Sequence, residues 1–99
     1  MRVYILVRKD LSASQRAVQG GHAISELILH HDVRDWALHH KTLIFLGVED
    51  EDDLLRWFDK TDIEKKSLFR EPDWNDSATA MAVLVNEDHK SQFKKLALI

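Results

Sequence analysis

Short apolar runs along the chain predict a sheet. Residues 3–7, 42–48 and 78–85 are nearly continuous runs of aliphatic, β-branched and aromatic side chains, which is typical of strands buried on both faces. Residues 66–70 form a shorter run in which polar and apolar side chains alternate. The pattern therefore predicts four strands, separated by stretches in which apolar residues follow a different spacing.

The longest of these stretches, residues 17–31, has apolar side chains at helical spacing. Ser12 or Ser14 precedes it, and either hydroxyl can cap a helix. Gly20 and Gly21 each cost a helix up to about 1 kcal/mol relative to alanine. Their presence favours close packing of the helix against another element over a ligand contact. The apolar positions of the helix are Val18, Ala23, Ile24, Leu27 and Ile28.

Three further helices are predicted. Residues 33–40 form a short helix that carries Trp36 inward. Residues 49–60 form a helix with acids at its start and Lys60 at its end, and both match the helix dipole. A terminal helix starts at Asn86 or Asp88. The side chains expected to be buried by it are Phe93, Leu96 and Leu98.

The order of these elements predicts the fold. A crossover helix follows each of the first two strands, which implies that those strands are parallel. Residues 71–76 hold the only proline and connect the last two strands tightly, which implies an antiparallel pair. We therefore expect one domain over residues 1–99, a three-layer α/β/α fold with a four-stranded mixed sheet in which one strand is antiparallel.

The composition excludes several classes of protein. Hydrophobic residues make up 44% and charged residues 31% of the chain, as in globular proteins, and no apolar run approaches the roughly 18 residues that span a bilayer. Without cysteine, disulfide and thiolate chemistry are excluded, and the cytoplasm is the expected location. A net charge of −3 means that contact with RNA would need a local basic patch. The residues expected to form it are Arg8, Lys9, Arg16 and Lys41.

Two groups of side chains resemble metal ligands but do not predict a metal site. The consecutive acids at residues 49–53 radiate around a helix axis instead of converging, so they favour a helix start. The histidine pairs at 30–31 and 39–40 are adjacent residues that point about 100° apart on a helix. A polar surface near the helix ends is the simpler interpretation, and no metal is expected.

The strongest candidate site lies where the first strand ends and the first helix begins. Arg8, Lys9 and Asp10 follow the strand directly, and the helix starts a few residues later. In open α/β sheets ligands bind at this junction, close to the positive end of the helix dipole.

Five segments of the chain together resemble a known family. They are Arg8-Lys9-Asp10-Leu11, Ala17-Val18-Gln19-Gly20-Gly21-His22-Ala23, Trp36, Asp50-Glu51-Asp52-Asp53-Leu54 and Ser77-Ala78-Thr79. In this order they resemble the peptidyl-tRNA hydrolase II family of archaea and eukaryotes, over essentially the whole chain. The resemblance implies that fold, hydrolysis of the ester between a peptide and a tRNA, and no cofactor. As partners it implies the 3′ end of a tRNA and a second copy of the chain.

The family pattern also implies site residues and marks two departures. The family's catalytic lysine aligns with Gln15, next to Arg16, and an arginine cannot accept a proton in a protein. Residues 71–76 replace the family's loop and lack its Gly-Arg-Thr, although Glu71 stands for its acid and Thr79 for its threonine. The implied catalytic residues are Asp10, Gln15, Arg16, Glu71 and Thr79, and the implied substrate-binding residues are Arg8, Lys9, Gln19, His22 and Ser77.

Several roles stay open at this point. Asp10 or Glu71 would orient a water, and Lys9, Arg16 or amides at the helix start would stabilise the oxyanion. His22 is either a base that titrates near neutral pH or a buried histidine bonded to a neighbour.

Without the lysine, three hypotheses follow. The protein is a hydrolase, or it is a catalytically inactive relative that binds RNA, a small ligand or a protein through the same cleft. The third is an oligomeric scaffold, which would place Trp57, Phe58 or Trp74 at a subunit contact.

Overall fold

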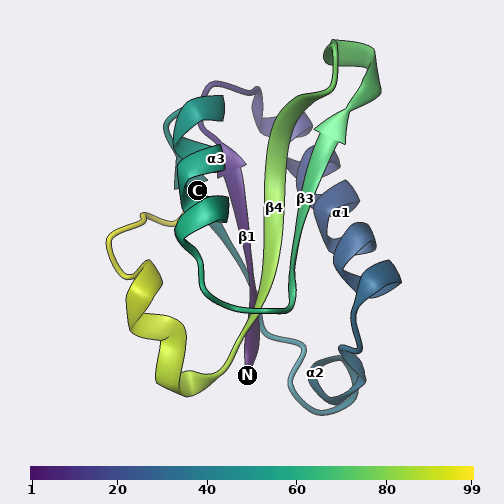
Figure 1. Ribbon diagram of the computed structural model, residues 1–99, viewed down its shortest axis with the longest axis vertical. Helices are drawn as coiled ribbons and strands as arrows, with labels where there is room; N and C mark the ends of the chain where they lie inside the picture. Colours follow the sequence, from purple (N-terminus) through teal and green to yellow (C-terminus); the bar gives the residue numbers. More distant parts are fainter.

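The computed structural model describes residues 1–99, and its four strands form a single sheet (Figure 1). The strands are β1 (Arg2–Arg8), β2 (Leu43–Val48), β3 (Lys66–Glu71) and β4 (Ser77–Val85), in the spatial order β2-β1-β4-β3. β1 and β2 are parallel, and β4 is antiparallel to both β1 and β3. The sheet is therefore mixed, with one antiparallel strand, as the sequence predicts.

Helices cover both faces of the sheet. α1 (Ala13–His30) and α2 (Arg34–His39) lie on one face, and α3 (Glu51–Lys60) and a 3-10 helix, η2 (Glu87–Phe93), lie on the other (Figure 1). Successive side chains of a strand point to opposite faces, so alternate residues of β1 enter two separate cores. Val3, Ile5 and Val7 pack on the α1 side. Tyr4 and Leu6 pack on the α3 side.

α1 approaches the sheet closely at one glycine. A Cβ added to Gly20 would lie 2.4 Å from the Phe45 ring and 3.1 Å from Ile5, whereas one added to Gly21 would meet nothing within 4 Å. The close packing predicted for the glycine pair is therefore confirmed for Gly20 and wrong for Gly21.

The rotation of α1 differs from the expected one. Ser12 caps the helix and accepts a hydrogen bond from the Gln15 amide at 3.2 Å. With Gly20 on the sheet, Val18 and Ile28 are 48% and 54% exposed, although their spacing suggested a buried face. The buried residues of α1 are Gln19, Gly20, Ala23 and Leu27.

β2 lies at one edge of the sheet, so the expectation that it is buried along its length is wrong. Leu43 is 45% exposed, and only the last three residues of the strand are buried. The end of the chain covers part of the outer edge of β2: the Gly47 amide donates to the Ala97 carbonyl at 3.0 Å, and the Ile99 amide donates to the Phe45 carbonyl at 3.2 Å.

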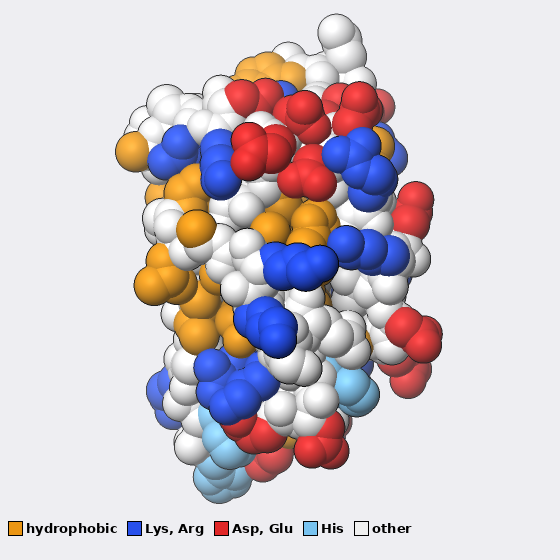
Figure 2. All heavy atoms as spheres, turned by 90° about the vertical axis from the view of Figure 1, so that its left-hand side faces the viewer, with side chains coloured by type: hydrophobic (Ala, Val, Ile, Leu, Met, Phe, Trp, Pro, Cys, Tyr) orange, Lys and Arg blue, Asp and Glu red, His pale blue; other side chains and the backbone are white.

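The C-terminal segment also differs from the prediction. It forms the 3-10 helix η2 instead of an α-helix, and Phe93 is buried as expected. Leu98 is 78% exposed, because residues 97–99 leave the core and lie along β2. Figure 2 shows the side of the molecule with α3 and the C-terminal segment, where apolar side chains are exposed beside lysines and arginines and acids gather at the upper end.

The aromatic residues expected at a subunit contact have different environments. Trp57 is 8% exposed and Trp74, in the 3-10 helix η1 (Pro72–Trp74), is 37% exposed. The Lys66 ammonium lies 4.2 Å from the centre of the Phe58 ring. Of the three, Trp74 is the most exposed. No helix has the length and apolar character that crossing a membrane would require.

Candidate functional site

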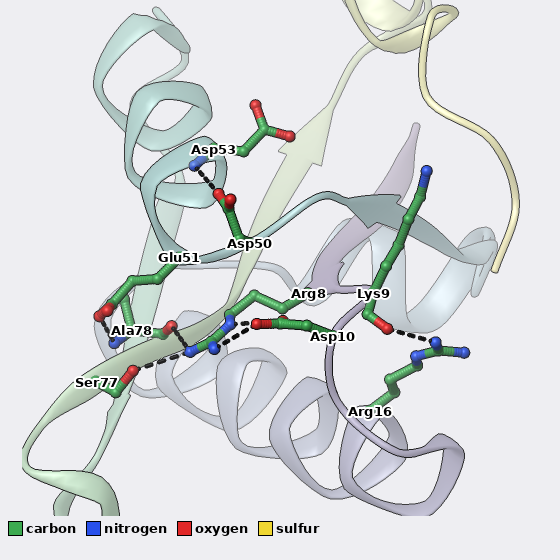
Figure 3. A network of polar contacts seen from close by, with 9 residues as sticks. All are labelled: Arg8, Lys9, Asp10, Arg16, Asp50, Glu51, Asp53, Ser77 and Ala78. Carbon is green, nitrogen blue, oxygen red and sulfur yellow. Dashed lines mark hydrogen bonds and ion pairs between the residues drawn. The ribbon is translucent and has the colours of Figure 1, made fainter.

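The carboxyl end of β1 meets the start of β4 in a charged cluster (Figure 3). The Arg8 guanidinium donates to both carboxylate oxygens of Asp10, at 2.9 and 2.8 Å. Its Nη1 donates to the Ser77 hydroxyl at 2.9 Å and to the Ala78 carbonyl at 3.2 Å. We call these four residues the Arg8 cluster. It joins two strands that are far apart in the sequence.

The Arg8 guanidinium controls the ionisation of Asp10. Hydrogen bonds and charge attraction from Arg8 hold the pKa of the Asp10 carboxyl below its usual range, against the opposing effect of burial. A carboxylate with a lowered pKa is a weak proton acceptor. Asp10 is therefore less suited to activating a water than a carboxylate without an arginine partner.

A second cluster surrounds a buried amide. The Thr79 hydroxyl donates to Gln19 Oε1 at 2.7 Å, and Gln19 Nε2 donates to Glu71 Oε1 and to Gln15 Oε1, at 3.3 Å each. We call these four residues the Gln19 cluster. Gln19 and Thr79 are fully buried, so in this conformation they act on a bound molecule only through Gln15 and Glu71, which are partly exposed.

The carboxylate of Glu71 fixes the polarity of the Gln19 cluster. An ionised carboxylate only accepts hydrogen bonds, so the amide nitrogen of Gln19 must face Glu71 and its oxygen must face Thr79. The same nitrogen donates to the Gln15 oxygen. Because the Gln15 oxygen accepts this bond, the Gln15 amide nitrogen does not donate within the cluster. It lies at the position where the family pattern has lysine.

The other two cations of the site lie on the β2 side of the turn, away from Ser77 (Figure 3). Arg16 donates to the Lys9 carbonyl at 2.7 Å, and the Lys9 ammonium pairs with Glu49 at 2.9 Å. Lys41 precedes β2, which runs parallel to β1, and therefore lies at the opposite end of the sheet. The expected basic patch is thus limited to Arg8, Lys9 and Arg16, and Arg8 and Lys9 are paired with acids.

His22 is exposed, so the interpretation as a buried, hydrogen-bonded histidine is wrong. Its ring stacks on Phe69 of β3, with the ring centres 4.5 Å apart and the planes inclined by 20°. The rotation of α1 explains this position, because His22 follows Gly21 on the outer side of the helix.

Sequence reasoning missed the contact of Glu51. This residue opens α3, where Asp50 caps the helix through the Asp53 amide at 2.9 Å, as expected of the acidic run. Glu51 also accepts a hydrogen bond from the Ala78 amide at 2.6 Å (Figure 3). No spacing signal distinguishes it from its acidic neighbours, so only the fold reveals that α3 holds the start of β4.

Asp10, Glu71 and Thr79 share one end of the sheet but line no hollow. The surface has four hollows, and Asp10, Glu71 and Thr79 line none of them. Arg16 borders one of about 210 Å³, together with Ala13, Ala17, Phe45 and Ile99. The arrangement can therefore orient a water or a polar group at its surface, but it does not enclose a ligand.

The comparisons with known proteins leave the family open. The sequence matches no protein-family model, and no curated protein matches it. The resemblance to the peptidyl-tRNA hydrolase II family is therefore carried by the residue pattern alone.

Proposed function

We propose that this protein hydrolyses the ester between a peptide and the 3′ end of a tRNA, with Glu71 orienting the attacking water. The observation that carries the proposal is the Gln19 cluster. A buried chain from Thr79 through Gln19 holds one oxygen of the Glu71 carboxylate, and the partly exposed side chain keeps an oxygen for water. A carboxylate held in this way loses little freedom when it binds its water.

Ester hydrolysis also needs a donor for the developing oxyanion. The polarity of the Gln19 cluster directs the Gln15 amide nitrogen away from Gln19, so Gln15 supplies the one amide nitrogen of the cluster that is not already donating within it. A neutral amide supplies a hydrogen bond but no charge and no titratable proton. We therefore expect slow turnover compared with a site that holds a lysine at this position.

The charge distribution favours contact with only the terminal nucleotides of the tRNA. The chain carries a net charge of −3, and acids gather at the site end of the α3 side (Figure 2). Phosphates are therefore repelled on that side and attracted on the α1 side, where Arg16 lies. A few phosphate contacts give weak binding that falls as salt rises.

The proposal is tested by the release of peptide from an N-acetylaminoacyl-tRNA. We expect Glu71→Gln to reduce the rate by about 100-fold or more, because removing a general base typically costs that much. Glu64→Gln is the matched control, since Glu64 is exposed and lies outside the cluster. Gln15→Lys should raise the rate. Equal rates for wild type and Glu71→Gln would contradict the assignment.

A second candidate function is favoured by the absence of a hollow around Asp10, Glu71 and Thr79. In it, the protein is a catalytically inactive relative that binds the single-stranded end of an RNA at the same surface. It predicts no release of peptide, but shifts of the amide NMR signals of residues 10–16 when an RNA ending in CCA is added. The two measurements together distinguish the candidates.

A further inference from the structure

The outer edge of β3 carries a groove that the candidate site does not use. β3 is the last strand of the sheet and has no strand beyond it. A hollow of about 450 Å³ follows this edge. Glu26, His30 and His31 border it from the end of α1, Phe58 borders it from α3, and β3 supplies its floor. We call this feature the β3 groove.

The pairing of β3 with β4 sets which backbone groups enter the β3 groove. The Leu84 amide donates to the Lys65 carbonyl at 2.9 Å, and the register continues with Leu68 opposite Met81. In an antiparallel pair, hydrogen-bonded and non-hydrogen-bonded positions alternate. Leu68 is therefore at a non-hydrogen-bonded position, and its amide and carbonyl point away from β4.

One outward-facing group of β3 already has a side chain as its partner. The imidazole Nε2 of His31 forms a hydrogen bond of 3.2 Å with the Lys66 carbonyl. This contact shows that a donor reaches the strand edge from the α1 side. The amide and carbonyl of Leu68 are the next outward-facing groups along the strand.

The β3 groove is basic, although the whole chain is acidic. Arg70 is exposed, and only its Nη1 is engaged, with the Asp76 carbonyl at 3.1 Å. The Lys66 ammonium bonds the carbonyls of Phe58 and Thr61. The single acid of the groove, Glu26, is paired with His30 at 3.0 Å. The groove therefore attracts negative charge.

We propose that the β3 groove binds an extended, acidic segment of a partner protein, which pairs with β3 as a fifth strand. Main-chain hydrogen bonds to Leu68 would supply affinity, and acidic side chains next to Arg70 would supply specificity. The opposite edge of the sheet demonstrates the same mode within the chain, since residues 97–99 lie along β2. Lys66 on the strand and the irregular register between Phe69 and Arg70 oppose indiscriminate edge pairing. The exposed charge of Arg70 favours an acidic partner.

The test uses two synthetic peptides of equal length, Ac-EVEVEVE-NH2 and Ac-KVKVKVK-NH2, added separately to the ¹⁵N-labelled protein. We expect the acidic peptide to shift the amide signals of Ser67, Leu68 and Arg70 and to slow hydrogen exchange of the Leu68 amide. The basic peptide should shift none of them. Shifts confined to other surfaces, equal shifts from both peptides, or no shifts from either would overturn the proposal.

A charge reversal completes the test. Arg70→Glu should weaken binding of the acidic peptide by about tenfold or more, because it places like charges at the contact. Arg56→Glu is the matched control, since Arg56 is exposed on α3 and does not border the β3 groove. Unchanged binding by Arg70→Glu, with both variants folded, would also overturn the proposal.

Discussion

Two polar clusters at the same end of the sheet are built in opposite ways. The Arg8 cluster is ionic and partly exposed, with the Arg8 and Asp10 side chains 15% and 45% exposed. The Gln19 cluster is centred on a neutral amide and a hydroxyl that are fully buried. The Arg8 cluster joins β1 to the start of β4, and the Gln19 cluster joins α1 to it. The main difference between the two clusters is therefore the exposure of their side chains to solvent.

The environment decides how much each cluster contributes to stability. An exposed ion pair contributes about 0–1 kcal/mol, because water competes for both charges and the side chains lose freedom. A buried polar group that loses its partner costs about 1–3 kcal/mol, because water cannot replace the missing hydrogen bond. The Gln19 cluster should therefore determine stability at this end of the sheet.

The largest expected effect is that of Thr79→Val. The substitution keeps the shape of the side chain but leaves Gln19 Oε1 without its donor, so we expect a loss of about 1–3 kcal/mol in the free energy of unfolding. Urea unfolding followed by circular dichroism measures it. Thr42→Val is the matched control, because Thr42 is exposed, and should change stability by less than about 0.5 kcal/mol. Equal effects of the two variants would remove the proposed contrast between the clusters.

The second prediction concerns how closely α1 approaches the sheet, which determines the burial of the Gln19 cluster. Gly20→Ala places a methyl group 2.4 Å from the Phe45 ring, so we expect a loss of about 1–3 kcal/mol from overpacking. Gly21→Ala meets nothing within 4 Å and should stabilise the helix by up to about 1 kcal/mol.

Both glycine variants also test the contrast between the clusters. If Gly20→Ala moves α1 outward, hydrogen exchange of the first α1 amides should accelerate, while Arg8 and Asp10 stay paired in the turn before the helix. Destabilisation by Gly21→Ala, or no effect of Gly20→Ala, would contradict the packing inferred for α1.

Much of the fold could be predicted from local signals. Apolar runs located the strands, and the connections between them gave the parallel and antiparallel pairs that the sheet has. The cap at Ser12 and the acidic start of α3 also follow from local chemistry. These features depend on residues close together in the chain, which is why sequence patterns reveal them.

Features that depend on tertiary contacts could not be predicted. The spacing of Val18 and Ile28 fits a buried helix face, but the Gly20 contact with Phe45 rotates α1 so that Gln19 is buried in their place. Whether β2 is central or lies at an edge depends on the strand order, which its composition does not reveal.

In the candidate site, too, local features could be predicted and tertiary contacts could not. The sequence placed Arg8 and Asp10 at the end of a strand, and the structure brings Ser77 to them through the antiparallel pairing of β4. The burial of Gln19 and Thr79 depends on the rotation of α1. The sequence therefore could not show that these two residues are inaccessible, whereas Gln15 and Glu71 are partly exposed.

The smallest expected effect belongs to the Arg8 cluster and depends on pH. Arg8 lowers the pKa of Asp10 in the folded protein, so the ionised carboxylate stabilises the folded state above its unfolded pKa of about 3.9. This contribution is lost as the pH falls through the folded pKa. We expect Asp10→Asn to cost less than about 1 kcal/mol at neutral pH, and the difference from wild type to shrink in acid.

Unfolding free energies measured between neutral pH and acid test this dependence. Asp73→Asn is the control, because Asp73 is exposed in η1 and outside both clusters, and its difference from wild type should not follow the same course. The sign is decisive: a carboxylate with a lowered pKa can lose its stabilising effect only as protons are added. If Asp10→Asn and Thr79→Val lowered the free energy of unfolding equally at neutral pH, the Arg8–Asp10 ion pair would contribute as much as the buried hydrogen bond of Thr79. Solvent exposure would then not explain how the clusters differ.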